Sequence, residues 1–184
     1  MTVAPTIETE RAVLRAHTRA DFEPFATMWA DPAVTTHFGR TFDRDESWGR
    51  FLRSVGLWPI MGFGYWAVED RESGAYLGLI GIADFGRGIP EITGVPEAGW
   101  VLAASAHGRG LATELVSSMM AWADTHIDAP ETCCIINPTN EPSIRVAEKM
   151  GYAYLDRVPF EEGETLIFKR PRHAAIRASI SSSP

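Results

Sequence analysis

Residues 100–113 read WVLAASAHGRGLAT and decide the fold of this chain. An apolar, strand-like run from Trp100 to Ala103 leads into a turn with glycines at positions 108 and 110, and a helix-like run from Leu111 to about Ile127 follows. Glycine has no Cβ, so the chain can bend tightly there and a ligand can approach the main chain closely. The first N–H groups of a helix have no partners within it, and the helix dipole adds partial positive charge. The stretch therefore predicts a site for an anion such as a pyrophosphate.

Length and composition favour a single domain. The chain has 184 residues, of which 45% are hydrophobic and 22% charged, enough for one substantial core. We expect this domain to span residues 1–170 and the Arg-, Ala- and Ser-rich residues 171–184 to form a disordered tail. No run approaches the ~18 apolar residues of a membrane span. The first ten residues lack the basic and apolar regions of a secretory signal, which favours a cytoplasmic protein.

Charge and ligand spacing exclude several classes of protein. The net charge is −7 and no block of consecutive Lys or Arg precedes residue 169, so direct nucleic-acid binding is disfavoured. An acidic surface tolerates a cationic or amine substrate instead. The two cysteines, Cys133 and Cys134, are adjacent and the five histidines are scattered, so we expect neither a structural disulfide nor a metal site.

The rest of the sequence predicts strands and helices on both sides of the turn. Thr18 and Asp43 are each followed three residues later by an acidic residue, a pattern typical of a helix N-terminus. Asn140, with a proline two residues later, and Gly151 are the expected ends of a further helix. Apolar runs predict strands at residues 11–15, 65–69, 75–85, 97–103, 132–137, 152–158 and 165–169.

Two segments in this order resemble the GCN5-related N-acetyltransferase (GNAT) superfamily: residues 108–112, GRGLA, and residues 140–152, NEPSIRVAEKMGY. The opening ERAVLR at residues 10–15 and Thr113-Glu114 after the turn are similar to the branch that includes ribosomal-protein and N-terminal amino-group acetyltransferases. The resemblance implies an α/β (α+β) fold with a central mixed, mostly antiparallel sheet and helices on both faces. It also implies that the sheet is splayed between the strands near Trp100 and Ile135.

The same resemblance implies acetyl-CoA as cosubstrate, lying in the splay. Its pyrophosphate would rest on the N–H groups of residues 108–112, and its pantetheine arm would pair with the main chain of residues 100–103. Asn140 would bind the pantetheine arm or the region of the sulfur. Many members carry Gln or Arg where this chain has His107. The residues expected to bind the cofactor are Trp100, Val101, Leu102, His107, Gly108, Arg109, Gly110, Leu111, Ala112, Thr113, Asn140 and Ser143.

Amine acetylation needs a base, because an alkylammonium has a pKa near ~10 and only the free amine attacks a thioester. The resemblance places a carboxylate near Glu97, the first candidate, and Asp84 is the reserve candidate, with a loop-entry role as its structural alternative. A main-chain N–H on the splayed strand, Val101 or Leu102, would stabilise the oxyanion of the tetrahedral intermediate.

The usual proton donor for the leaving thiolate is absent. Many members use a Tyr four residues before the helix-ending glycine, and here that position is Ala147. Ser143, or a water held by Asn140 and Ser143, becomes the replacement hypothesis. The structural alternative is that Ser143 is an ordinary residue of a helix cap. A thiol with a pKa near ~8.5 can also leave as the thiolate without an acid.

The predicted function is an N-acetyltransferase that moves the acetyl group of acetyl-CoA to a primary amine, on a protein N-terminus or a small molecule, by direct attack in a ternary complex. The alternative is a nonenzymatic acyl-CoA-binding or regulatory module. A dinucleotide-binding loop is disfavoured because Thr113 replaces its third glycine. We expect the amine to meet residues 35–44 and 86–96, no membrane or nucleic-acid partner, and a monomer or homodimer.

Overall fold

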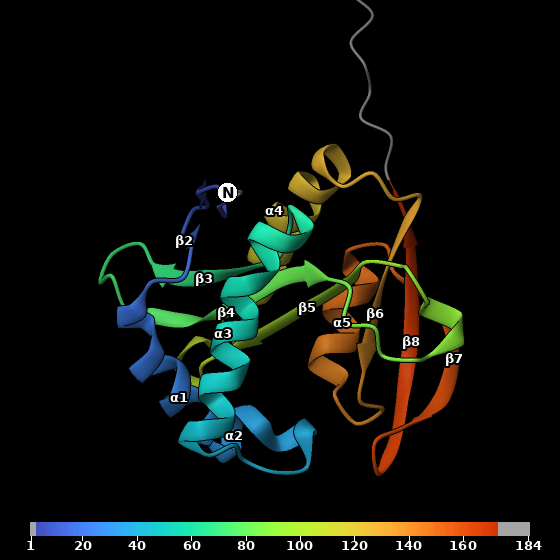
Figure 1. Ribbon diagram of the computed structural model, residues 1–184, viewed down its shortest axis with the longest axis horizontal. Coiled ribbons are helices and arrows are strands. Elements are labelled where there is room, and N and C mark those ends of the chain that lie inside the picture. The colour runs from blue at the N-terminus through green and yellow to red at the C-terminus, as the bar shows by residue number, and fades with distance from the viewer. Residues whose placement is uncertain (1–2, 173–184) are drawn as a thin grey trace, which may run out of the picture.

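The computed structural model describes residues 3–172, which form one eight-stranded sheet with helices on both faces (Figure 1). The strands lie in the order β1-β2-β3-β4-β5-β6-β8-β7. They are β1 (Ile7–Glu8), β2 (Ala12–Arg15), β3 (Tyr65–Asp70), β4 (Tyr76–Ala83), β5 (Glu97–Leu102), β6 (Glu131–Ile136), β7 (Ala153–Phe160) and β8 (Gly163–Pro171). The helices are α1 (Phe22–Ala30), α2 (Pro32–Thr35), α3 (Arg44–Met61), α4 (Leu111–His126) and α5 (Glu141–Lys149).

Two separate apolar cores hold the helices against the sheet. On one face, α1 and α3 cover β3 and β4 (Figure 1) through an aromatic core that includes Phe22, Phe25 and Phe51. The side chains that α4 and α5 bury belong to a second core, with Leu115 and Ala147 among its fully buried members. Burial of these apolar surfaces is the main force that fixes helices to a sheet. The predicted α/β fold with a mixed, mostly antiparallel sheet is confirmed.

The helix starts that the sequence predicted are present. Thr18 and Asp21 form a capping box ahead of α1, and Asp43 and Glu46 form a second one at the start of α3. The short helix α2 was not predicted, although Asp31 accepts a hydrogen bond from the N–H of residue 33 as its cap and a proline occupies the first helical position. That Asp-Pro pair is itself a helix-start signal.

The end of the chain differs from the prediction at one boundary. Pro171, expected as the first tail residue, belongs to β8, and the N–H of Arg172 donates to the carbonyl of Pro130. This strand pairs with every residue of β6, and the pair Glu131–Pro171 carries it past the predicted end at residue 169. The remainder of the expected tail, residues 173–184, lies outside the described residues.

The sheet is splayed where β5 meets β6. These neighbouring strands are parallel, and Glu97 and Cys133 are their one paired position. Beyond that point the two strands diverge toward their carboxyl ends (Figure 1), whereas β5 stays paired with β4 along six residues. The predicted splay is therefore confirmed. The unpaired edge of β5 and the connections that follow β5 and β6 meet at the same end of the sheet.

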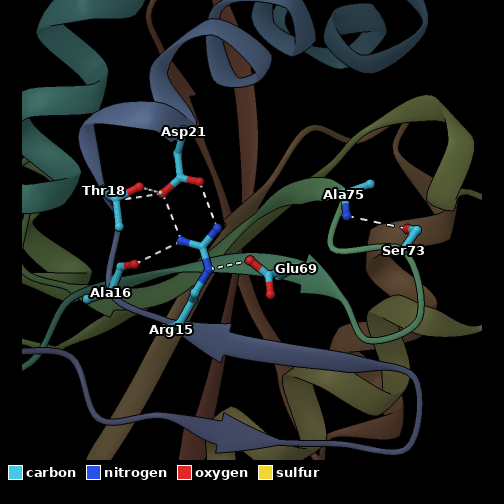
Figure 2. Close-up of polar contacts among 7 residues, drawn as sticks. All are labelled: Arg15, Ala16, Thr18, Asp21, Glu69, Ser73 and Ala75. Atoms are coloured by element: carbon cyan, nitrogen blue, oxygen red, sulfur yellow. Dashed lines mark hydrogen bonds and ion pairs between the residues drawn. The ribbon is translucent and has the colours of Figure 1, made fainter.

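A charged cluster anchors β2 to the start of α1 and to β3 (Figure 2). Both terminal nitrogens of Arg15 donate to the Asp21 carboxylate at 2.8 Å, and its Nε donates to Glu69 at 2.6 Å. Burial alone would raise the pKa of Asp21, but the hydrogen bonds from Arg15 and from the Thr18 N–H hold this pKa below its ordinary value. The cluster fixes the segment from which His17 projects.

His17 makes the stability of the fold depend on pH. Its ring lies among Phe25, Phe51 and Tyr76, and burial lowers the pKa of His17 to about 4, against the opposing effect of the Asp21 carboxylate. In the unfolded chain this pKa is ~6.5. Between these values the unfolded state binds a proton that the folded state does not. We therefore expect the free energy of unfolding to fall, by up to about 3 kcal/mol, as the pH drops from ~6.5 toward 4.

Urea unfolding at pH 7.5 and pH 4.5 measures this contribution. The His17→Gln variant lacks the titrating ring, so its stability should change less between the two pH values than that of the wild type. Equal pH dependence in the two proteins would show that His17 is not responsible.

Candidate functional site

The turn after β5 has the backbone conformation that its glycines predict. Gly108 and Gly110 have φ angles of +71° and +72°, in the left-handed region that residues with a Cβ rarely adopt. Gly110 is the N-cap of α4. A Cβ built on either glycine would meet nothing within 4 Å, so the surface above both is open. The turn is therefore accessible to a ligand from outside.

A row of free hydrogen-bond donors lines this turn. Within residues 3–172, no carbonyl or side chain accepts a hydrogen bond from the main-chain N–H groups of residues 108–113. The carbonyl of Arg109 accepts from Arg11 at 2.7 Å, and Arg11 also pairs with Glu114 in the first turn of α4. These contacts fix the turn to the rest of the fold while leaving its N–H groups directed outward. Together with the dipole of α4 they form a cradle suited to a phosphate group.

His107 is held by the protein itself. Its Nε2 lies 2.9 Å from the carbonyl oxygen of Leu102, and its N–H donates to the carbonyl of Ala104. A carbonyl oxygen only accepts, so Nε2 carries the proton. The side chain thus joins the turn to the end of β5, which is a different role from the cofactor contact predicted for His107.

The register of β5 decides which main-chain groups face the splay. The main-chain N–H of Ala103, which follows β5, donates to the carbonyl of Leu77 in β4 at 2.8 Å. Because alternate residues of an antiparallel strand direct their N–H and C=O groups to opposite edges, Val101 also faces β4, whereas Trp100 and Leu102 face the splay. Of the two N–H groups expected to stabilise an oxyanion, Leu102 is available and Val101 is not.

Side chains from β5 and α5 meet across the splay. The indole N–H of Trp100 donates to the hydroxyl of half-buried Ser143 at 3.3 Å. Asn140 caps α5, because its Oδ1 accepts from the N–H of Ser143 at 3.2 Å. Ala147, one turn farther along α5, is fully buried and offers no polar atom. The structure thus brings together Trp100, Asn140 and Ser143, three residues predicted for the cofactor site. The side chain at position 147 supplies no proton donor.

Glu97 is buried at the point where the splay begins. Its side chain is 7% exposed, and Arg87 donates to both carboxylate oxygens, at 2.5 and 2.7 Å. Burial alone would lower the pKa of Arg87, but the Glu97 carboxylate keeps it above the ordinary value. The pair lines a cavity of about 260 Å³ enclosed by residues 84–97. Asp84, the reserve candidate, is exposed and accepts from the N–H of Gly86, as a loop cap does.

Two neighbours of Glu97 were missed by the sequence analysis. One is Arg87. Its signal in the sequence was that it is the one Lys or Arg in the second predicted substrate loop, residues 86–96. The other is Tyr65, whose hydroxyl lies against Gly99 in the position that a Cβ at residue 99 would occupy. Burial and the nearby Glu97 carboxylate raise the pKa of Tyr65. No sequence signal joined this tyrosine to Glu97, because the contact depends on the pairing of β3, β4 and β5.

The first of the two predicted substrate loops reaches across the open end of the splay. The Asn137 side chain donates to the carbonyl of His37 at 3.2 Å, and the His37 ring lies 3.1 Å from the hydroxyl of Thr139. The segment after α2 is thereby tied to the connection between β6 and α5. Among the described residues there is no cluster of three potential metal ligands, and no helix is long and apolar enough to cross a bilayer.

Comparisons with known proteins agree with this geometry. A family model described as an acetyltransferase (GNAT) domain matches residues 11–153. A crystal structure of an acetyltransferase from Agrobacterium tumefaciens is 30% identical, covers 92% of this chain and 95% of its own, and superposes with a TM-score of 0.79. A putative GnaT-family acetyltransferase from Bordetella pertussis is 28% identical, with coverage of 91% and 99% and a TM-score of 0.81. The uncharacterized N-acetyltransferase p20 of Bacillus licheniformis is 24% identical over 149 residues, or 80% of this chain and 82% of p20.

Proposed function

The chain belongs to the GNAT acetyltransferase family, and from this premise we propose that it moves the acetyl group of acetyl-CoA to a primary amine by direct attack in a ternary complex. The observation that carries the proposal is the row of free N–H groups at residues 108–113, beside a strand with an unpaired edge. Two proteins of the same fold, at 12% and 13% identity, are described as complexes with CoA: a ribosomal L7/L12 α-N-protein acetyltransferase, and a spermidine N-acetyltransferase from Vibrio cholerae.

The pyrophosphate of acetyl-CoA would accept hydrogen bonds from the turn, and the side chain of Arg109 would add positive charge. The pantetheine amides would pair with the main-chain groups of Trp100 and Leu102, which face the splay. The Leu102 carbonyl already accepts from His107 and has one lone pair left, which a pantetheine N–H could use. The Leu102 N–H is left as the proposed donor to the oxyanion.

Glu97 is the proposed proton acceptor for the amine, through a water molecule. A carboxylate offers about four lone-pair positions, and the two hydrogen bonds from Arg87 leave room for a water on either oxygen. The two hydrogen bonds from Arg87 fix the orientation of the carboxylate. The support for this role is the place of Glu97 at the start of the splay, beside a cavity that a substrate amine could enter.

Ser143 is the proposed donor to the leaving thiolate. Its oxygen accepts from Trp100, so its own proton is free to be donated. In the Ser143→Ala variant we expect kcat to fall about tenfold at pH 7, and by less above the thiol pKa of ~8.5, where the thiolate leaves unaided. The cap of α5 uses the N–H of residue 143 and should persist. Rates from pH 6.5 to pH 9.5 test this role, and a rate unchanged at pH 7 would assign Ser143 to the cap alone.

A nonenzymatic acyl-CoA-binding module is the second candidate, favoured by Ala147 in place of a proton donor. Thiol release from acetyl-CoA in the presence of mixed primary amines separates the two functions. A transferase releases CoA only when an amine is present, and mass spectrometry then finds an acetylated amine. Cofactor binding without amine-dependent release would assign the binding function.

A further inference from the structure

Beside the proposed site lies an arginine, Arg50, that forms no ion pair within residues 3–172. The Arg50 guanidinium of α3 lies 3.8 Å from the ring centre of Phe42 and 4.8 Å from that of Trp29. Among residues 3–172 no carboxylate or carbonyl accepts a hydrogen bond from it. The indole N–H of Trp29 is also buried without an acceptor in this part of the chain. The Arg50 guanidinium and the Trp29 indole N–H are therefore neighbouring donors, and neither has an acceptor within residues 3–172.

Arg53, one turn farther along α3, links this position to the cavity of Glu97. Its guanidinium lies 5.4 Å from the ring centre of Phe85, and Arg87 lies 4.8 Å from the same ring. Phe85, Arg87 and Glu97 line the cavity, so Arg53 contacts a lining residue from outside the cavity. No ion pair of Arg53 is present in the described residues either. Arg50 and Arg53 thus form a pair of free cations, the arginine pair, next to the place proposed for the amine.

Positive charge exceeds negative charge around the arginine pair. Arg40 is neutralised by Glu46, and Arg87 by Glu97. Two carboxylates act electrostatically on Arg50 without a hydrogen bond to it: Glu46, which is paired with Arg40, and Glu161, an exposed residue between β7 and β8 that also acts on Arg87.

The protonated form of Arg50 is poorly compensated as a result. Burial, followed by the charges of Arg53 and Arg40, lowers the pKa of Arg50 to about 10. An anion placed between Arg50 and Arg53 would relieve this cost and would accept from both guanidinium groups.

We propose that the amine substrate carries a carboxylate and that Arg50 and Arg53 bind it, leaving the amine beside Glu97. This inference rests on the proposed function and names its substrate class: a free amino acid, or a peptide whose acidic side chain lies near its N-terminus. The proposal disfavours polyamines, because a polycation would be repelled by two arginines that form no ion pair in the described residues. The net charge of −7 favoured a cationic substrate. That charge is a sum over the whole chain and does not show that the region around the arginine pair is basic.

A matched pair of substrates tests the proposal. For the wild type, we expect kcat/KM to be about tenfold or more higher for an amine with a carboxylate than for its carboxamide, and lowest for a linear polyamine. Amino acids and peptides with an acidic second residue are assayed separately, to find which source supplies the carboxylate. A wild type that accepts the carboxamide or the polyamine equally well overturns the proposal and leaves acetyl transfer intact.

Variants locate the effect. Arg50→Gln and Arg53→Gln should each lower kcat/KM for the amine with a carboxylate toward the value for its carboxamide, and so remove most of the preference. Arg19→Gln is the control, because Arg19 also rests on an aromatic ring, that of Trp48, but lies in none of the segments around the cavity. The double variant Arg50→Glu/Arg53→Glu should favour the polyamine, a gain that misfolding cannot mimic. A preference that survives in all of these variants contradicts the proposal.

Direct binding separates this inference from the proposed function. If acetyl-CoA binds and no amine is acetylated, the transferase assignment fails, and calorimetry with the free amino acid decides the anion site. If Arg50→Gln binds the free amino acid about tenfold more weakly than the wild type, the anion site is supported. Equal affinity in the wild type and Arg50→Gln contradicts it.

Discussion

Gly110→Glu should raise the dissociation constant for acetyl-CoA at least about 100-fold while the domain remains folded, since a carboxylate placed against the like charge of the diphosphate costs several kcal/mol. The new carboxylate would project from the rim of the turn, whose N–H groups are the proposed partners of the pyrophosphate. No neighbour lies within 4 Å of the added Cβ, so the side chain does not disturb the core. At a φ of +72° any residue with a Cβ also costs roughly 1–2 kcal/mol of backbone strain.

Gly110→Ala separates charge from strain. It has the same backbone cost without the carboxylate, so its affinity for acetyl-CoA should fall by far less than that of Gly110→Glu. Calorimetric titration with acetyl-CoA gives both constants, and circular dichroism confirms that both variants are folded. Unchanged affinity in Gly110→Glu would mean that the pyrophosphate binds elsewhere.

The second large effect concerns Glu97. In the Glu97→Gln variant we expect kcat/KM to fall about 100-fold at pH 7, where the amine arrives protonated and a base is needed. The loss should shrink as the pH approaches the amine pKa of ~10, because the free amine then attacks without help. A pH–rate series from pH 6 to pH 10 measures both the loss and its slope.

Two controls keep this result interpretable. Asp84→Asn changes a carboxylate at the rim of the same cavity, one that only caps a loop, and should leave the rate unchanged. Thermal unfolding and acetyl-CoA affinity of Glu97→Gln report any structural loss, because neutralising Glu97 leaves Arg87 without its partner. A loss of rate that is constant across the pH range, or none at all, would remove Glu97 from the role of base.

Much of the fold follows from local signals in the sequence. Each correctly predicted boundary depends on the chemistry of a few adjacent residues: the capping boxes at Thr18 and Asp43, the cap at Asn140, and the left-handed glycines of the turn. The mixed sheet and its splay came from resemblance to a family, and the order of the strands was not predicted, since pairing between distant strands leaves no short-range pattern.

The chemistry of the site was less predictable for the same reason. The Glu97–Arg87 pair spans ten residues of loop, and the contacts of His107 with Leu102 and of Trp100 with Ser143 depend on tertiary geometry. Alternation along β5 could have been read from sequence, but which edge each residue faces is set by the pairing with β4. The arginine pair gave no signal, because its importance is the absence of partners, which only a structure reveals.

A crystal structure of the complex with acetyl-CoA would show whether the cofactor binds at the turn after β5. We predict diphosphate oxygens within hydrogen-bonding distance of the main-chain N–H groups of Gly108 to Ala112, with the pantetheine arm along the unpaired edge of β5. A cofactor bound at another surface, with the turn after β5 free of phosphate, would contradict the account.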